Sequence, residues 1–224
     1  MTPQEFFGDW TKVIDLNELQ TVLGKLNQLN PELLCPRPSN VFRAFKLCPY
    51  RECRVVFLGQ DPYPQKGVAT GVLFGNKADT PEDKLSPSLE VIKECCINYE
   101  VPHGPIEFDS TLESWAKQGI LMINSALTCK VNEIGSHVNL WRQFIAKLLK
   151  NLSYRETGII YVLFGKQAQT FEPYIDSRYN DIIKVEHPAY FARANKIMPY
   201  RVFTDINKLL NGKYGETTTW YTEY

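Results

Sequence analysis

Four short apolar runs, separated by segments with helical spacing, constrain the fold of this chain most strongly. They span residues 54–58, 120–123, 159–164 and 182–185, with the sequences RVVFL, ILMI, IIYVLF and IIKV. Runs of this length and composition are typical of strands buried on both faces of a parallel sheet. Strands that alternate with helices predict helices on both faces of that sheet. We therefore expect an α/β fold, a single three-layer α/β/α domain with a central, mainly parallel four-stranded sheet.

Capping residues and apolar periodicity mark the helical segments. Residues 110–113 (STLE) predict a capping box that opens a helix, which Gly119 can end. Ser86 and Pro87 predict an N-cap followed by the first residue of another helix. Apolar residues at helical spacing predict two further helices, over 140–152 and over 202–210 before Gly212.

The composition is that of an ordinary globular protein, with 44% hydrophobic and 22% charged residues. No linker, repeat or low-complexity tract divides the 224 residues, so we expect residues 1–224 to form one domain. The first ten residues lack the basic and apolar regions of a secretory signal. No apolar run approaches the length of about 18 residues that a membrane-spanning helix needs.

The six cysteines favour a reduced, cytoplasmic protein without a metal or other cofactor. They form no CxxC pair and have no histidine partner at zinc spacing, and a chain of this length can bury a core without disulfides. The net charge of zero argues mildly against a nucleic-acid partner. Charge can nevertheless be local, and six basic residues lie in or near the loops considered next: Lys66, Lys130, Lys166, Arg193, Lys196 and Arg201.

Polar residues follow each apolar run. The first run is followed by residues 59–64 (GQDPYP), the second by Asn124, the third by Gly165 and Lys166, and the fourth by His187. The carboxyl ends of parallel strands meet at one edge of a sheet, and ligands bind beyond that edge. We therefore expect these four loops to form one site.

The side chains at this edge have a definite chemistry when they are taken together. Asp61, stiffened by the proline after it, can act as a general base, and His187 can donate a hydrogen bond to a developing anion. Asn124 offers donors and an acceptor to a nucleobase edge, and Phe74 can stack on a planar ring. Each residue taken singly also has a structural reading, as a turn, strand-end or core residue. With neither GxSxG nor HExxH present, the set favours hydrolysis of a bond to a planar heterocycle.

Residues 59–63 (GQDPY) resemble the water-activating motif of the uracil-DNA glycosylase family. The resemblance covers about residues 38–212. The further segments that carry it occur in the family's order: 71–74 (GVLF), 86–89 (SPSL), 115–119 (WAKQG), 124–128 (NSALT), 136–137 (SH), 164–165 (FG) and 187–188 (HP).

The resemblance implies a monofunctional DNA repair glycosylase that flips uracil out of DNA and hydrolyses its N-glycosidic bond, leaving an abasic site. It implies that Asp61 activates the attacking water and stabilises the positively charged sugar. It implies that His187 stabilises the uracil anion. Glycosylases are among the enzymes known to take the target base out of the duplex. The implied partners are single- or double-stranded uracil-containing DNA and a DNA-mimic inhibitor protein, with the enzyme itself a monomer.

The resemblance also implies a uracil pocket and a DNA-gripping surface. In the pocket, Tyr63 would clash with the methyl group of thymine, Phe74 would stack on uracil, Asn124 would read its polar edge, and main-chain groups around Gln60 would add donors. A wedge inserted into the emptied base stack aligns with Phe191, with Tyr190 beside it. The DNA-contacting set comprises Ser86, Ser88, Gly165, Lys166, Ala189, Tyr190, Phe191 and Arg193.

Four positions depart from the family pattern. Pro64 and Thr70 stand where the family has histidine, and Lys166 and Ala189 stand where it has serine. These departures, with the zero net charge, leave two alternatives to an active uracil-DNA glycosylase. One is a DNA-binding protein on the same scaffold without catalysis, and the other is a glycosylase with a different base preference, against which Tyr63 argues.

Overall fold

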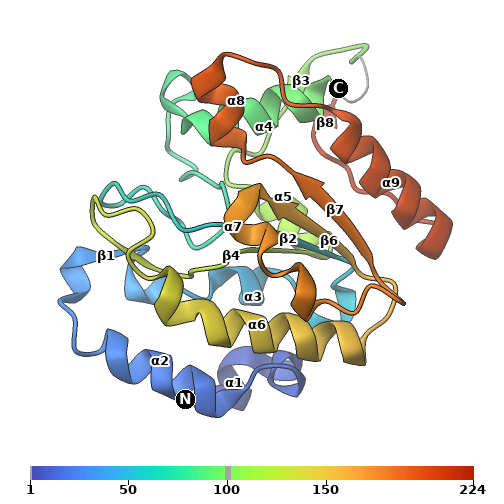
Figure 1. Ribbon diagram of the computed structural model, residues 1–224. Helices are drawn as coiled ribbons and strands as arrows, with labels where there is room; N and C mark the ends of the chain where they lie inside the picture. Colours follow the sequence, from blue (N-terminus) through green and yellow to red (C-terminus); the bar gives the residue numbers. More distant parts are fainter. Residues whose placement is uncertain (1, 99–101) are drawn as a thin grey trace.

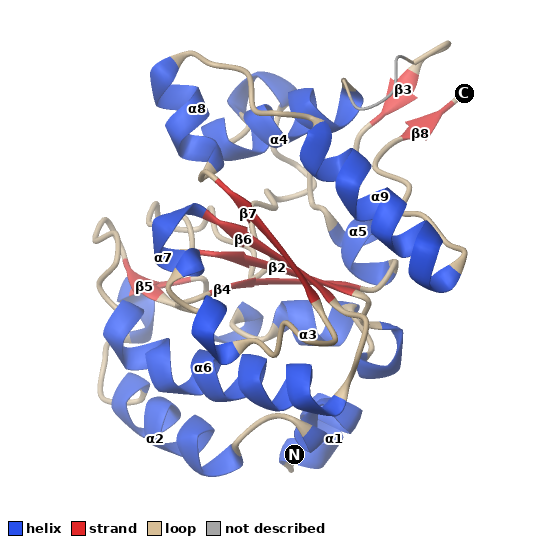
Figure 2. Ribbon diagram, turned by 45° about the vertical axis from the view of Figure 1, so that its right-hand side comes forward, coloured by secondary structure: helices blue, strands red, loops and turns tan. Residues whose placement is uncertain are grey.

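The four apolar runs form one sheet. The structure, a computed structural model, describes residues 2–98 and 102–224. Strands β2 (Val55–Gly59), β4 (Ile120–Asn124), β6 (Ile160–Phe164) and β7 (Asp181–Val185) pair in the order β4-β2-β6-β7, with every neighbouring pair parallel. Helices cover both faces of this sheet (Figures 1 and 2). The predicted α/β fold with a parallel four-stranded sheet is confirmed, and the strand bounds shift by about one residue.

Alternate residues of the strands face two separate cores. Val56 and Leu58 of β2 lie in one buried cluster, and Val55 and Phe57 lie in the other. The first cluster packs under α1 (Pro3–Phe7), α2 (Leu16–Leu26), α3 (Arg43–Leu47), α6 (Val138–Arg155) and α7 (Gly165–Gln169). The second packs under α4 (Pro87–Ile97), α5 (Glu113–Lys117), α8 (Pro188–Ala194) and α9 (Arg201–Tyr214).

Strand β7 differs from its prediction. Its apolar run indicated a strand buried on both faces, but its residues are only partly buried or exposed. β7 lies at the edge of the sheet, beside β6 alone, so less of its surface is covered. The predicted face of α6 is confirmed, because its apolar side chains are buried against the first core.

The predicted capping box over 110–113 is wrong. α5 begins at Glu113, and the Asp109 carboxylate accepts hydrogen bonds from the backbone N–H groups of Thr111 (2.9 Å) and Ser114 (2.8 Å). The Glu113 carboxylate forms an ion pair with Arg43 and is therefore not used for capping. A charged partner that is distant in the sequence has overridden the local motif.

The observed start of α4 and end of α9 differ in detail from the predictions. Ser86 and Pro87 do begin α4, but the Ser86 hydroxyl accepts a hydrogen bond from Asn76 Nδ2 (2.8 Å) and does not cap the helix. α9 continues through Gly212 to Tyr214, so the predicted end before Gly212 is wrong. Gly215, in the left-handed conformation with φ 69°, ends this helix.

Two small antiparallel pairs connect distant segments. β1 (Leu34–Cys35) pairs with β5 (Cys129–Lys130), and β3 (Ile106–Glu107) pairs with β8 (Thr222–Glu223). The segment of 215–224, which lies beyond the family resemblance, is therefore tied to the rest of the chain. Figure 2 shows β3 and β8 side by side near the C-terminus.

The cysteines and the helices bear on two further expectations. All six cysteines are free and buried, which confirms the expectation of buried thiols. Among the described residues, no helix is both long and apolar enough to cross a membrane.

Candidate active site

The loops that follow the four strands meet at one edge of the sheet. Ser125 donates through its backbone N–H to Gly59 O (2.9 Å) and through its hydroxyl to Gln60 O (2.8 Å), which joins the loop after β4 to the loop after β2. On the other side, Gly165 lies against His187, because a Cβ atom at residue 165 would be 2.8 Å from that of His187. The predicted convergence of the four loops is therefore observed.

Asp61 lies in the loop after β2 and is only partly exposed. Its Oδ2 atom accepts a hydrogen bond from the backbone N–H of Gly135 (2.5 Å), and Gln60 also bonds to the carboxylate. Burial raises the pKa of Asp61 above its usual value, and these two hydrogen bonds oppose the shift by stabilising the charged form. The result is a fixed carboxylate that has lost much of its hydration and is a stronger base than an exposed aspartate.

His187 follows β7 and is the N-cap of α8. Its Nδ1 atom accepts a hydrogen bond from the backbone N–H of Ala189 (3.2 Å). Burial, and then the positive charge of Arg193, lowers the pKa of His187 to about 4. The imidazole is therefore neutral at pH 7, and because Nδ1 is an acceptor, the single proton is on Nε2.

Tyr63 and Phe74 are joined by a hydrogen bond. The Tyr63 hydroxyl donates to the carbonyl oxygen of Phe74 (3.0 Å), and burial raises the pKa of this hydroxyl. The Phe74 ring lies edge-on to the rings of Phe164 and His187, with centroid distances of 5.2 and 5.6 Å. The Phe74 ring is thus held beside the imidazole, and Tyr63 is hydrogen-bonded to the Phe74 backbone.

Asn124 ends β4 and lines a pocket with Tyr63 and Phe74. Its Oδ1 atom is buried and has no hydrogen-bond partner among the described residues. Glycine is required opposite, since a Cβ atom at residue 59 would lie 2.7 Å from Asn124 Oδ1 and 2.3 Å from Leu73 Cδ1. A buried amide oxygen left without a partner is costly, and a ligand that donates a hydrogen bond there removes the cost.

The predicted DNA-contacting residues differ in their accessibility. Lys166 and Arg193 are exposed near the site, and Ala189 is part of the first turn of α8. Ser88 is buried, and Ser86 is held by Asn76 on both its hydroxyl and its backbone N–H. The two serines are therefore less free to contact a phosphate than the two cations.

The aromatic pair on α8 is divided between surface and core. Tyr190 is 42% exposed, whereas Phe191 is 9% exposed and belongs to the second core cluster. Successive residues of a helix point in different directions, so the alignment that placed the wedge at Phe191 selects the side chain that faces inward. Burial thus argues against Phe191 as the wedge and favours its neighbour.

Two of the departures from the family pattern have structural roles. The Pro64 carbonyl accepts hydrogen bonds from Asn132 N (2.9 Å) and from the Cys35 thiol (3.4 Å). The buried Thr70 hydroxyl donates to Gly75 O (3.1 Å). Both residues stabilise the loops that carry the site.

Two residues that support the site were missed by the sequence reasoning. Ser125 holds the Gln60 carbonyl, and its position directly after Asn124 was a signal that could have identified it. Gly135 donates a hydrogen bond from its backbone N–H to the Asp61 carboxylate. A backbone contact of this kind cannot be predicted from the residue type. In the described part of the chain, no group of three or more His, Cys, Asp or Glu side chains is placed to hold a metal ion.

The edge of the parallel sheet thus carries a pocket lined by two aromatic rings and an amide, a neutral imidazole beside one of the rings, and a carboxylate in the same loop as Tyr63. Such an arrangement is typical of an enzyme that acts on a heterocyclic ligand. The model of the Uracil DNA glycosylase superfamily matches residues 45–211. A uracil-DNA glycosylase of Alkaliphilus metalliredigens is 33% identical over 226 residues, covering 96% of each chain. One of Campylobacter jejuni is 34% identical over 188 residues, covering 83% of this chain and 78% of the relative. The chain belongs to the uracil-DNA glycosylase superfamily.

Solved structures support the same fold. Mimivirus uracil-DNA glycosylase superposes with a TM-score of 0.75 at 23% identity, covering 98% of this chain and 93% of that chain. A variant of the mimivirus protein in complex with UGI gives a TM-score of 0.78 at 25% identity, covering 98% of this chain and 88% of that chain.

Proposed function

We propose that this chain excises uracil from single- and double-stranded DNA by hydrolysing the N-glycosidic bond. The observation that carries the proposal is the buried, unpartnered Oδ1 atom of Asn124 in a pocket lined by Tyr63 and Phe74. Uracil donates a hydrogen bond from N3–H, which satisfies that oxygen, and accepts one at O4 from the Asn124 amide group. Cytosine has no N3–H and would leave the oxygen unpaired, so the pocket rejects it.

Asp61 and His187 divide the chemistry. The bond between sugar C1′ and uracil N1 breaks, and its electron pair leaves with the base as an anion. His187 donates its Nε2 proton as a hydrogen bond to the uracil oxygen on which that charge develops. Water adds to C1′ and gives its proton to Asp61, whose negative charge also stabilises the positive sugar. The orientation of the two side chains by Gly135 and Ala189 supports these roles.

Uracil release from an oligonucleotide with a single uracil tests the proposal. Single-stranded and duplex substrates are incubated with the wild-type protein, with and without EDTA, and free uracil is measured. Release from both substrates is expected, and no release from either would refute the proposed function. UGI, with which a variant of the mimivirus relative is in complex, is the protein to test as the expected DNA-mimic inhibitor, and it should block release by occupying the DNA surface.

The protonation state of His187 gives a prediction on pH dependence. A pKa of about 4 means that the imidazole gains a charge only as the pH falls through that value, far below the usual 6.5. We expect ¹⁵N NMR of the His187 ring to report the neutral Nε2–H form from pH 8 to about 5. A loss of uracil release that sets in above about pH 5 would then come from another group, and Asp61, whose pKa burial raises, is the candidate. A His187 titration near pH 6.5 would contradict this assignment.

The exposed aromatic residue of α8 gives a prediction on the wedge. We propose that Tyr190 enters the base stack when the uracil leaves it, because it is exposed and Phe191 is not. Tyr190→Ala is expected to reduce kcat/KM about tenfold or more on duplex DNA and much less on single-stranded DNA, where little stacking is lost. Tyr154→Ala, at an exposed tyrosine of α6, serves as the matched control. Equal losses on both substrates would exclude Tyr190 as the wedge.

A further inference from the structure

The loop from Thr70 to Gly75 carries Phe74 in an unusual backbone conformation. Phe74 has φ 63°, in the left-handed region that bulky residues rarely adopt. Such a conformation persists only when the surrounding structure holds it, and it is often found at functional sites. The contacts of this loop therefore identify what keeps the Phe74 ring in the pocket.

The Thr70 side chain links residues at both ends of this loop by hydrogen bonds. Its hydroxyl donates to Gly75 O (3.1 Å) and accepts from Val72 N (3.3 Å), while Gly75 N donates to Val72 O (3.2 Å). Phe74 lies within this closed set of hydrogen bonds. A hydroxyl can donate and accept at once, which suits threonine to this position, where the family pattern has histidine.

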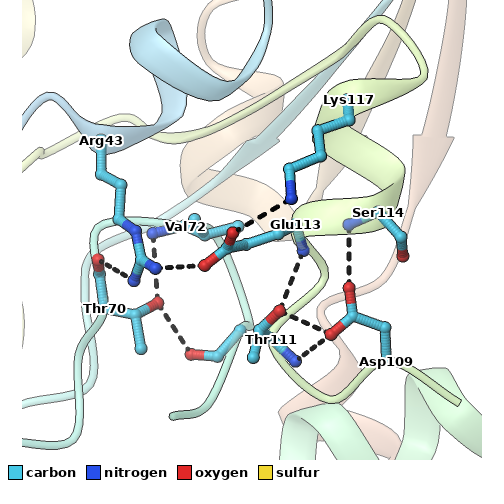
Figure 3. A network of polar contacts seen from close by, with 9 residues as sticks. Arg43, Thr70, Val72, Asp109, Thr111, Glu113, Ser114 and Lys117 are labelled. Carbon is cyan, nitrogen blue, oxygen red and sulfur yellow. Dashed lines mark hydrogen bonds and ion pairs between the residues drawn. The ribbon is translucent and has the colours of Figure 1, made fainter. Parts of the chain in front are cut away.

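Arg43 and Glu113 hold the loop from the outside. Arg43, the first residue of α3, donates through Nη1 to Thr70 O (3.4 Å) and forms an ion pair with Glu113, the first residue of α5. The two side chains are 35% and 22% exposed, so the pair is partly shielded from water. Figure 3 shows the arginine lying between the loop and the helix, in contact with both.

The position of Glu113 is itself determined by the turn before α5. Asp109 accepts hydrogen bonds from Thr111 N and Ser114 N, and the Thr111 hydroxyl accepts from Glu113 N (3.2 Å). Asn76 N donates to Ser110 O (2.9 Å), which ties the end of the Phe74 loop to the same turn. The loop is therefore held between two helices that lie on opposite faces of the sheet.

We propose that Arg43, Thr70 and Glu113 are positioning residues for base recognition. They keep Phe74 beside His187, and through the Phe74 carbonyl they keep the Tyr63 hydroxyl in place. If the loop relaxes, Tyr63 loses its hydrogen bond and the methyl group of thymine gains room. The network thus sets the discrimination between uracil and thymine, an inference that rests on the proposed function.

Four variants test the network. Thr70→Val removes the hydroxyl, and Thr70→Ser retains it. Arg43→Met removes the outer contact, whereas Lys117→Met removes a different ion pair of Glu113, at 3.5 Å, and leaves Arg43 in place. Each variant is assayed for kcat and KM of uracil release and for thymine release from a matched oligonucleotide. Amide hydrogen exchange at Val72 and Gly75 is measured by NMR without DNA, and thermal unfolding verifies folding.

Thr70→Val and Arg43→Met are expected to lower kcat/KM for uracil about 10- to 100-fold and to raise thymine release relative to uracil, since small displacements of reacting groups have effects of this size. Exchange at Val72 and Gly75 should accelerate about tenfold in the same two variants. Thr70→Ser should stay within about twofold of the wild type because it retains the hydroxyl. Lys117→Met should do the same because surface ion pairs contribute little.

Base release and amide hydrogen exchange are independent readouts, so they separate this inference from the proposed function. An inactive wild type would refute the proposed function, and the exchange rates would still decide whether the network holds the loop. Unchanged exchange in Thr70→Val and Arg43→Met would overturn the inference. Folded variants with accelerated exchange and an unchanged thymine-to-uracil ratio would also overturn it, because the network would then be structural only.

Discussion

Asp61→Asn is expected to lower kcat for uracil release by about 10²- to 10⁴-fold, the range that a general base contributes. Asparagine has nearly the shape of aspartate, and its amide oxygen can still accept the hydrogen bond from Gly135 N. The variant should therefore fold and bind DNA as the wild type does. In the proposed mechanism, what it loses is the group that takes the proton from water and the negative charge that faces the sugar.

Single-turnover assays on one oligonucleotide, with DNA affinity measured in parallel, check this expectation. Asp83→Asn, at an exposed aspartate outside the site, is the matched control and should retain full activity. A wild-type rate in Asp61→Asn would refute the assigned role. Loss of DNA binding together with activity would point to a damaged fold instead of missing chemistry, and a thermal unfolding scan would distinguish the two.

Much of the fold and the location of the site could be predicted from the sequence. The runs before Gly59, Asn124, Gly165 and His187 form the predicted parallel strands, and the polar residues lie together because parallel strands end at one edge. Strand length and apolar content are local properties, so they can be predicted from a short stretch of sequence. The roles of the individual side chains in catalysis stay proposals.

Contacts between distant segments could not be predicted in this way. The motif over 110–113 satisfied a local capping rule, yet Glu113 bonds to Arg43, seventy positions away in the chain. The inward direction of Phe191 depends on how α8 packs against the core, which alignment to a family wedge does not encode. The local capping rule fails at 110–113 because a tertiary contact decides the outcome. The choice between Phe191 and Tyr190 as the wedge stays a prediction.

The C-terminal segment shows the same limit more clearly. The family resemblance ends at about residue 212 and implies nothing about the residues after it, but Trp220 is only 3% exposed and lies in the second core. Its ring meets those of Phe203, Trp115 and Phe57, with centroid distances of 4.7, 4.9 and 6.4 Å. Phe57 belongs to β2, so the tail packs directly on the strand that leads into the Asp61 loop.

Trp220→Ala is accordingly expected to destabilise the protein by about 3–5 kcal/mol, the cost of removing a large aromatic side chain from a core. For a chain of this length, that lowers Tm by roughly 6–20 °C. The backbone of the tail also contributes, since Thr218 bonds twice to Asn207, at 2.9 and 3.0 Å, but the substitution leaves those hydrogen bonds in place. The expected loss therefore comes from the cavity and the lost apolar contact.

Trp220→Phe separates packing from polarity in this core. The Trp220 Nε1 atom is buried without a hydrogen-bond partner among the described residues, so phenylalanine removes an unsatisfied donor while keeping an aromatic ring. We expect Trp220→Phe to retain most of the stability in chemical denaturation, and both variants to release uracil at the wild-type rate well below their Tm. A Tm for Trp220→Ala within about 2 °C of the wild type would contradict a role for the tail in the core.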